Sequence, residues 1–353
     1  MGGGKDSYTI EYLEEAKSAF ESDGGKSEWI DLLEESADDF KLAYSGDADA
    51  QVRVGNRFFT GDGVDEKDLR ASVYWWHRAA VGGHSMAQCK VGMAYYFGKG
   101  VEENEPEAFK WFEKAALQGD AEAMCRYAEC FRYGNGTDMD FGKAIEWYRK
   151  SAEAGNALAQ ENLAMMYYKG LGAEKNLKEA FKWFKEAAGE DREKSQFWVG
   201  KFYAEGLGGV EKDLGKAVEW YEKAAEQDNT DAICALGWCY QLGNGVEQDF
   251  EKAVEWFRKG ADNDCGVCMN NLARLIEEGK GIEQDYGEAI MLFKKAVEND
   301  CNRAKYHIGR FYENGLGVDT DVDTAKEWYR KAADNGDKDA KAALERLGCV
   351  AVQ

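Results

Sequence analysis

The sequence predicts an all-α solenoid, a right-handed superhelix of helix-turn-helix repeats, and three observations support this fold class. A small residue recurs every 36 or 37 residues along most of the 353-residue chain. Glycine pairs interrupt helical segments at the same period, and the whole chain contains one proline. A period of this length is typical of stacked supersecondary units. The small residues that open the eight copies are Ala50, Ala87, Ala123, Ala159, Ser195, Ala232, Cys268 and Ala304.

The chain is expected to begin with an acidic helical cap over residues 1–49. Two helices are predicted there, Tyr8 to Phe20 and Ser27 to Tyr44, separated by Asp23-Gly24-Gly25. Fourteen acidic residues and four lysines give this segment a net charge of −10. Because the end units of a solenoid need a polar outer face, the segment suits a capping role.

The eight repeats are expected to span residues 50–339, each with two helices. In the third copy one stripe of the first helix consists of Ala123, Tyr127, Ala128 and Phe131. Gly134 and Gly136 then end that helix, since glycine readily adopts the left-handed conformation of a C-cap. Asp138 or Asp140 caps the second helix, Lys143 to Ala152. A C-terminal capping helix and tail, residues 340–353, follow the last copy.

Recurring residues also predict how the helices of a copy pack together. A glycine inside a helix costs ~1 kcal/mol relative to alanine, so its recurrence in the first helix indicates close packing. These glycines are Gly92, Gly200, Gly237 and Gly309. Large aromatic residues of the second helix are expected to fill the core. They are Trp111, Trp147, Trp183, Trp220, Trp256 and Trp328, followed by Phe112, Tyr148, Phe184, Tyr221, Phe257 and Tyr329.

The repeats resemble the Sel-like repeat family, which is related to the tetratricopeptide repeats. The sixth copy carries the pattern most fully, with Leu236-Gly237, Gly243-Asn244-Gly245-Val246, Lys252-Ala253 and Trp256-Phe257. The resemblance covers residues 50–339. It implies a right-handed α-solenoid and, for most members, a scaffold or adaptor role in protein–protein interaction. One cysteine-rich secreted branch binds or slowly hydrolyses β-lactams, but its regular disulfide pattern does not recur here.

Composition argues against several classes of partner. The net charge is −22 and the sequence pI is about 4.7, whereas nucleic-acid binding needs clustered Lys and Arg. Anionic membrane surfaces are disfavoured for the same reason, and no apolar run reaches the ~20 residues of a membrane span. The N-terminus lacks the apolar core of a signal peptide. We therefore expect a cytoplasmic protein, with a mature secreted or periplasmic form left open, and a monomer, with a homo-oligomer left open.

One face of the first helix varies freely between copies and is the predicted partner-binding surface. We call it the helix A face, made of the residues 3, 6 and 10 positions after the small residue that opens each copy. By analogy with related solenoids it should line a concave groove. The predicted contacts are Arg53, Lys90, Met93, Phe97, Arg126, Tyr133, Met165, Trp198, Lys201, Trp238, Leu242, Arg274 and Arg310.

The chemistry of this face predicts the kind of partner. Arg53, Lys90 and Arg126 form a basic row in an acidic chain, and aromatic residues flanked by arginine are typical of interface hot spots. We expect a peptide or protein segment with apolar anchors and some acidic residues, held centrally by Trp198 and Trp238. The alternative is that the assignment is off by one position and these tryptophans pack between repeats.

Trp76 is predicted to be a second unusual position. Counted from the opening residue of each copy, its register elsewhere is held by charged residues such as Glu113 and Arg149. An exposed Trp76 would be a further contact, and the alternative is that the longer loop Val81-Gly82-Gly83-His84 covers it.

No catalytic residue, metal ligand set or cofactor is predicted. His77 and His84 lie far along the chain from His307, which makes nucleophile–base pairing hard to arrange. The nine cysteines are an odd number with no constant pairing. Cys265, Cys268 and Cys301 could cluster across neighbouring copies as plain thiols, as a disulfide or as ligands of a metal that lacks an evident fourth ligand.

The sequence thus predicts a non-catalytic scaffold or adaptor that binds a protein or peptide. Two alternatives remain open. One is an acidic immunity-type protein that neutralises a toxin or effector, and the other is a β-lactam-binding or hydrolysing enzyme as in the cysteine-rich relatives.

Overall fold

The computed structural model describes residues 37–62 and 67–349. The predicted helix Tyr8 to Phe20 lies outside the described residues, as does most of the second helix of the N-terminal cap. The chain divides into two compact units, Met1–Trp183 and Phe184–Gln353. Each unit is described by itself below.

The described residues form 18 helices and no strand, which confirms the predicted fold class. The helices up to the boundary between the units are α2 (Ala37–Ser45), α3 (Ala48–Thr60), α4 (Leu69–Val81), α5 (Ser85–Phe97), α6 (Glu105–Leu117), α7 (Ala121–Tyr133), α8 (Phe141–Glu153), α9 (Ala157–Lys169) and α10 (Leu177–Gly189), which contains that boundary. The others are α11 (Glu193–Glu205), α12 (Leu214–Glu226), α13 (Thr230–Leu242), α14 (Phe250–Asp262), α15 (Gly266–Glu278), α16 (Tyr286–Glu298), α17 (Ala304–Asn314), α18 (Val322–Asp334) and α19 (Lys338–Arg346).

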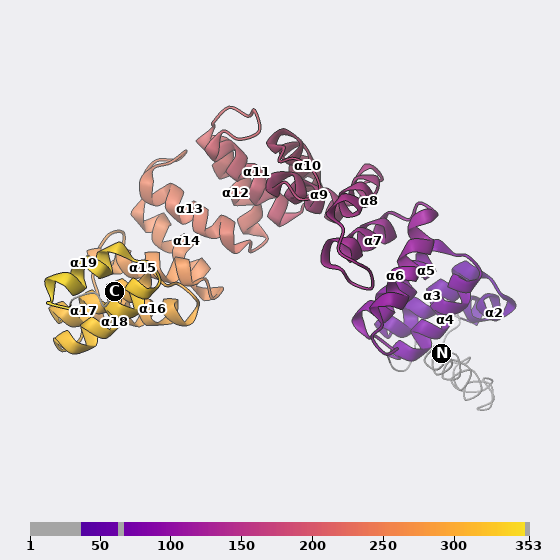
Figure 1. Cartoon of the computed structure of the whole chain (residues 1–353), viewed down its shortest axis with the longest axis horizontal. Helices are drawn as coiled ribbons and strands as arrows, with labels where there is room; N and C mark the ends of the chain where they lie inside the picture. Colours follow the sequence, from indigo (N-terminus) through magenta and orange to yellow (C-terminus); the bar gives the residue numbers. More distant parts are fainter. Residues whose placement is uncertain (1–36, 63–66, 350–353) are drawn as a thin grey trace. The chain divides into compact units, whose positions relative to one another are not determined.

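Within each unit, from α2 to α9 and from α11 to α19, helices that follow one another in the chain pack side by side. Odd-numbered helices from α3 to α17 are the first helices of the eight copies, and α4 to α18 are the second helices. Figure 1 shows the pairs α3 with α4, α5 with α6 and α7 with α8 in the first unit, and α13 with α14 in the second. Each copy thus buries the apolar stripes of its two helices against each other and against the next copy.

Turn residues end and start the helices as the sequence predicts. In the third copy Gly134 adopts the left-handed conformation (φ 78°), and its N–H donates to the Cys130 carbonyl. Asp140 is the residue that caps α8, where its carboxylate accepts a hydrogen bond from the Lys143 N–H at 3.0 Å. A side-chain acceptor at the N-cap stabilises a helix by ~1 kcal/mol, because it satisfies an otherwise unpaired N–H.

The second glycine of each turn sets the contact between consecutive copies. A Cβ on Gly136 would lie 2.3 Å from the Glu105 carbonyl oxygen at the start of α6, in the preceding copy. Its φ is also positive, at 72°. Only glycine permits both the conformation and this approach. The same backbone contact recurs at Gly100, Gly172, Gly245, Gly281 and Gly317.

Glycines inside the first helices lie against the aromatic residue of the second helix, as their recurrence predicts. A Cβ on Gly92 would lie 2.6 Å from the Phe112 ring, and a Cβ on Gly237 would lie 2.4 Å from the Phe257 ring. Both rings are buried. The helices approach closely only because no side chain stands between the first-helix backbone and the ring.

Trp76 belongs to this buried aromatic row. The prediction that it stands at a position held by charged residues in the other copies is therefore wrong. It is 5% exposed, and a Cβ on Gly55 would lie 2.5 Å from its ring. Its indole N–H donates to the Asn56 side-chain oxygen at 3.2 Å, and the Lys90 ammonium lies 5.2 Å from the ring centroid. The extra residue of the first copy lies before Trp76, between α3 and α4, because the N-cap Asp68 follows Ala50 by 18 residues whereas the N-cap Asn104 follows Ala87 by 17. Counting from the opening residue therefore shifted its register by one.

No helix in the described ranges has the length and apolar character needed to cross a membrane.

Candidate protein-interaction surface

The helix A face carries charged residues in the first unit, and each has a partner within the chain. Arg53 pairs with Asp39 at 2.8 Å, and about half of its side chain is exposed. Lys90 lies over the Trp76 ring. Arg126 is a quarter exposed and pairs with two carboxylates. The predicted basic row is therefore partly neutralised by the protein itself.

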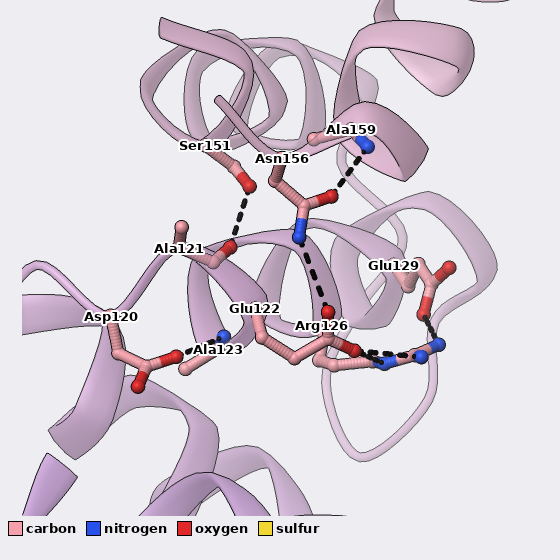
Figure 2. A network of polar contacts seen from close by, with 9 residues as sticks. All are labelled: Asp120, Ala121, Glu122, Ala123, Arg126, Glu129, Ser151, Asn156 and Ala159. Carbon is pink, nitrogen blue, oxygen red and sulfur yellow. Dashed lines mark hydrogen bonds and ion pairs between the residues drawn. The ribbon is translucent and has the colours of Figure 1, made fainter. Parts of the chain in front are cut away.

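Arg126 belongs to a polar network that joins the third and fourth copies (Figure 2). Its guanidinium donates to Glu122 at 2.9 Å and to Glu129 at 3.0 Å. The second oxygen of Glu122 accepts a hydrogen bond from the Asn156 amide at 3.2 Å, and Asn156 caps α9 through the Ala159 N–H at 2.9 Å. A single side chain, Asn156, thus links the start of one first helix to the charged face of the preceding one.

Burial gives this network its electrostatic character. Desolvation raises the pKa of the Glu129 carboxyl, although the nearby Arg126 guanidinium acts in the opposite direction. A charged pair in such a setting is held by several hydrogen bonds, because an unpaired charge would be costly. Arg126 therefore positions two helices in addition to being a predicted contact for a partner.

Two apolar residues of the helix A face in the first unit are well exposed to solvent. Phe97 is 50% exposed and Tyr133 is 59% exposed. They are the last residues of α5 and α7, and a hydrogen bond of 2.5 Å from the Asn135 amide to the Tyr96 hydroxyl connects these two helix ends. Met93 and Met165 are half-buried.

The two central tryptophans lie in the second unit, each half-buried against a buried ring. Trp198 stacks on Phe184 with ring centroids 5.4 Å apart and planes 7° apart. Trp238 meets Phe257 edge to face at 5.9 Å. Each indole thus has one side held by the core.

Two further residues of the face accompany these tryptophans. Lys201 lies one turn from Trp198, with its ammonium 4.8 Å from the centroid of that ring. Leu242, at the end of α13, is 56% exposed.

The C-terminal part of the face gathers polar groups that lack partners. Arg310 pairs with Glu277, yet its buried Nε has no hydrogen-bond partner in the described part of the chain. The same holds for the side-chain nitrogen Nδ2 of Asn271, which is 3% exposed, and for Nδ1 of His307. Arg274 lies 4.0 Å from Glu278. Asn271 and His307 were not predicted as contacts, although both lie on the helix A face.

The three histidines occupy separate structural positions. His77 packs edge to face on Trp111, and burial and then the Lys114 charge lower its pKa. His84 is the N-cap of α5 and lies 2.9 Å from Asp49. His307 stacks on a phenylalanine of α16 in the second unit.

A thiol cluster forms at the start of α15, with a membership that differs from the prediction. Cys265 is the N-cap, where its sulfur accepts from the Cys268 N–H at 3.4 Å. Hydrogen bonds from the thiols of Cys234 and Cys268 lower the pKa of Cys265. Cys301 is a more distant neighbour in electrostatic contact. All nine cysteines are free thiols, and within the described residues no group of three His, Cys, Asp or Glu has metal-binding geometry.

Solved structures are similar to this chain over nearly its full length. A Sel1 repeat protein from Oxalobacter formigenes is 27% identical, with a TM-score of 0.65, and the match covers 92% of this chain and 91% of that one. A protective antigen of uropathogenic Escherichia coli strains, described as having an SLR fold, is 27% identical with a TM-score of 0.50, and the match covers 95% and 90% of the two chains.

An immunity protein from Pseudomonas aeruginosa is 20% identical with a TM-score of 0.39, over 61% of this chain and 81% of its own. That likeness is too low to carry an argument about function. The comparison with curated proteins gives no match.

The model of the Sel1 repeat matches the chain eight times in succession, in the register of the helix pairs described above. The matches are residues 48–84, 85–120, 121–156, 157–190, 193–229, 230–265, 266–301 and 302–337. They cover most of the chain and leave no copy of the 36-residue period unmatched. The chain therefore belongs to the Sel1 repeat family.

Proposed function

We propose that this protein is a non-catalytic interaction scaffold that holds a peptide or protein segment on its helix A face. Sel1 repeat proteins are generally interaction scaffolds. The observation that carries the proposal is the state of Trp198 and Trp238, which are half-buried on buried aromatic rings. A rigid aromatic residue that keeps one side accessible gives up little conformational entropy on binding, which is why such residues dominate interface energetics.

The exposed ends of the first helices extend the same proposal into the first unit. Phe97 and Tyr133 hold equivalent positions in consecutive copies and expose half or more of their surface. Both stand on helices whose ends are hydrogen-bonded to each other. Apolar side chains fixed on rigid elements form a better-defined contact than side chains on loops.

The test captures partners from a native lysate with the purified full chain and with two variants of the face. The variants are Phe97→Ser/Tyr133→Ser and Trp238→Leu. Matched controls alter second helices, which the proposal leaves free: Leu117→Ser, at a residue that is 70% exposed, and Trp220→Leu, at a half-buried tryptophan. Circular dichroism confirms that every variant keeps its helical content.

A partner identified by mass spectrometry is then purified and its Kd is measured by calorimetry. Because the loss of a hot-spot side chain costs ~2 kcal/mol or more, we expect Kd to rise by about thirtyfold for the face variants and to stay within about threefold for the controls. A partner that binds the face variants as tightly as the unaltered chain contradicts the assignment of the helix A face.

A further inference from the structure

Three buried nitrogens on two neighbouring first helices have no hydrogen-bond partner in the described part of the chain. They are Nδ2 of Asn271 on α15, and Nδ1 of His307 and Nε of Arg310 on α17. Asn271 is 97% buried, since its exposed fraction is 3%. The amide NH2 and the guanidinium N–H are donors only. Since buried polar groups are normally paired and an unpaired buried donor is destabilising, this part of the face is suited to a ligand that brings acceptors.

Arg274 connects these groups. It lies one helical turn after Asn271, and its charge lowers the pKa of both His307 and Arg310, so it faces α17. Burial is the larger cause of the shift at both groups. The carboxylate of Glu277 pairs with Arg310, and Glu278 reaches Arg274 only at 4.0 Å. The positive charges of Arg274 and Arg310 are therefore incompletely compensated, in a chain of net charge −22.

We propose that Asn271, Arg274, His307 and Arg310 form a carboxylate-binding site for an acidic side chain, aspartate or glutamate, of the bound segment. This inference rests on the proposed function and names the chemistry that one part of the face recognises. A carboxylate has two oxygens that accept from the arginine fork and from an amide NH2 together. Trp238 packs against the hydrophobic cluster that contains Met269 and Leu272 on α15, so an apolar residue of the segment fits beside the carboxylate.

The charge balance favours a single negative charge over a phosphate. Glu277 and Glu278 remain beside the site, and like charges within a few ångströms repel. A phosphate carries a charge near −2, so its repulsion from these two carboxylates is about twice that of a carboxylate. The negative field of the whole acidic chain disfavours it further. A monoanion gains the same donors at a smaller electrostatic cost.

The experiment titrates the full chain with N-acetyl-leucyl-aspartate amide and follows the histidine side chains by NMR. Burial, and then the charges of Arg274 and Arg303, lower the pKa of His307 to about 4, whereas Asp337 and Glu278 raise it. A carboxylate bound next to the ring favours the imidazolium, so the apparent pKa of His307 should rise as the peptide saturates the site. His77, in the first unit, is the internal reference, and its pKa should not change when the peptide binds.

Four comparisons decide the outcome. N-acetyl-leucyl-asparagine amide has nearly the same shape without the charge and should produce no saturable shift of His307. Arg274→Gln, at a third-exposed residue, should raise Kd about tenfold, since a hydrogen bond to a charged group contributes about 1.5–3 kcal/mol. Arg310→Lys keeps the positive charge but loses the paired N–H donors of the guanidinium group, and it should also weaken binding. Lys150→Gln, on the second helix α8 of the first unit, removes an exposed lysine that pairs with Glu146 and should leave Kd unchanged.

The proposal is overturned if His307 does not respond to the aspartate peptide, if the asparagine peptide shifts it equally, or if Arg274→Gln binds as the unaltered chain does. Inorganic phosphate is titrated in the same way. If phosphate binds more tightly than the aspartate peptide, the site recognises phosphate and the carboxylate proposal is wrong. If the dipeptide does not bind but a captured partner still loses affinity for the Phe97 and Trp238 variants, the scaffold function holds and this site does not. Saturable dipeptide binding without such a partner leaves the site without the scaffold function.

Discussion

Four aspartates of the second unit adopt a left-handed backbone conformation at the turn between consecutive copies. They are Asp191, Asp228, Asp264 and Asp300, with φ between 56° and 60°. Gly83, Gly119, Gly155 and Gly336 hold the same position in the other copies, with φ between 87° and 94°. An L-residue in this region pays a steric cost that glycine avoids. These four turns are therefore local points of strain in an otherwise regular repeat.

Replacing Asp264 by glycine should stabilise the second unit by roughly 0.5–1 kcal/mol, because glycine enters this conformation without the steric cost. Urea unfolding followed by circular dichroism measures the change. Asp264→Asn is the matched control, since it removes the same charge but keeps a side chain. Asp228→Gly should gain less, because Asp228 pairs with Lys259 at 2.9 Å. Equal stabilities of the glycine and asparagine variants at position 264 would assign the effect to charge alone.

The thiol of Cys265 should be the most readily alkylated of the buried and half-buried cysteines named here. Hydrogen bonds from the Cys234 and Cys268 thiols lower its pKa, which raises the fraction of the reactive thiolate form. Burial raises the pKa of Cys89 and Cys125, which should stay unreacted. Brief treatment with iodoacetamide at pH 6.5 and 8, followed by peptide mass spectrometry, measures the order.

The variant Cys234→Ala removes one of the hydrogen bonds and should slow the modification of Cys265, most strongly at pH 6.5. Modification of Cys89 as fast as Cys265 would contradict the predicted thiolate.

At the scale of the element, much of the fold follows from the sequence because a single register repeats. The period, the glycine turns and the aromatic rows each predict helix pairs, and they agree with one another. Trp76 shows where this reasoning fails, since one added residue in a turn shifts every count made across it. The partnerless nitrogens of Asn271 and Arg310 were also beyond prediction, because they depend on how two helices of neighbouring copies are rotated against each other.

The second glycine of each turn should be the least replaceable part of a copy. A Cβ on Gly245 would lie 2.2 Å from the Leu214 carbonyl oxygen, and the residue has a φ of 79°. Gly245→Ala should therefore combine a backbone cost of about 1–2 kcal/mol with a packing cost of about 1–3 kcal/mol. Gly209→Ala is the control, because Gly209 has a φ of 82° and nothing within 4 Å of its Cβ position. If the urea midpoint falls equally for the two variants, the contact between copies does not contribute to the stability difference.

At the scale of the molecule, each unit is a row of copies in which a helix chiefly contacts the helices before and after it. The stability of such an array is approximately a sum of the contributions of single copies and of the interfaces between neighbours. The candidate site uses the same arrangement, since the helix A face is assembled from equivalent positions on successive helices. In the proposed function, one copy would therefore contribute only a few contacts to a partner.

Deleting residues 121–156 should leave a folded protein that is one copy shorter. The new junction joins Asp120 to Ala157, and Asp120 would then cap α9 in place of Asn156, because both cap through the N–H three residues later. Helical content per residue, measured by circular dichroism, should stay unchanged. Deleting residues 121–138 instead removes a first helix without its partner, and should lower helicity and unfold part of the first unit. Equal behaviour of the two deletions would contradict the independence of the copies.

Contacts confined to neighbours also determine how the protein responds to mechanical load. Each copy encloses only a short stretch of chain, so closing its contacts costs little loop entropy and should be fast. Under tension applied at the two ends, such a row yields one hairpin at a time and recoils when the tension is released, because every interface re-forms locally. The same regularity that places equivalent residues on the helix A face therefore predicts that each unit lengthens stepwise under load, one helix pair after another.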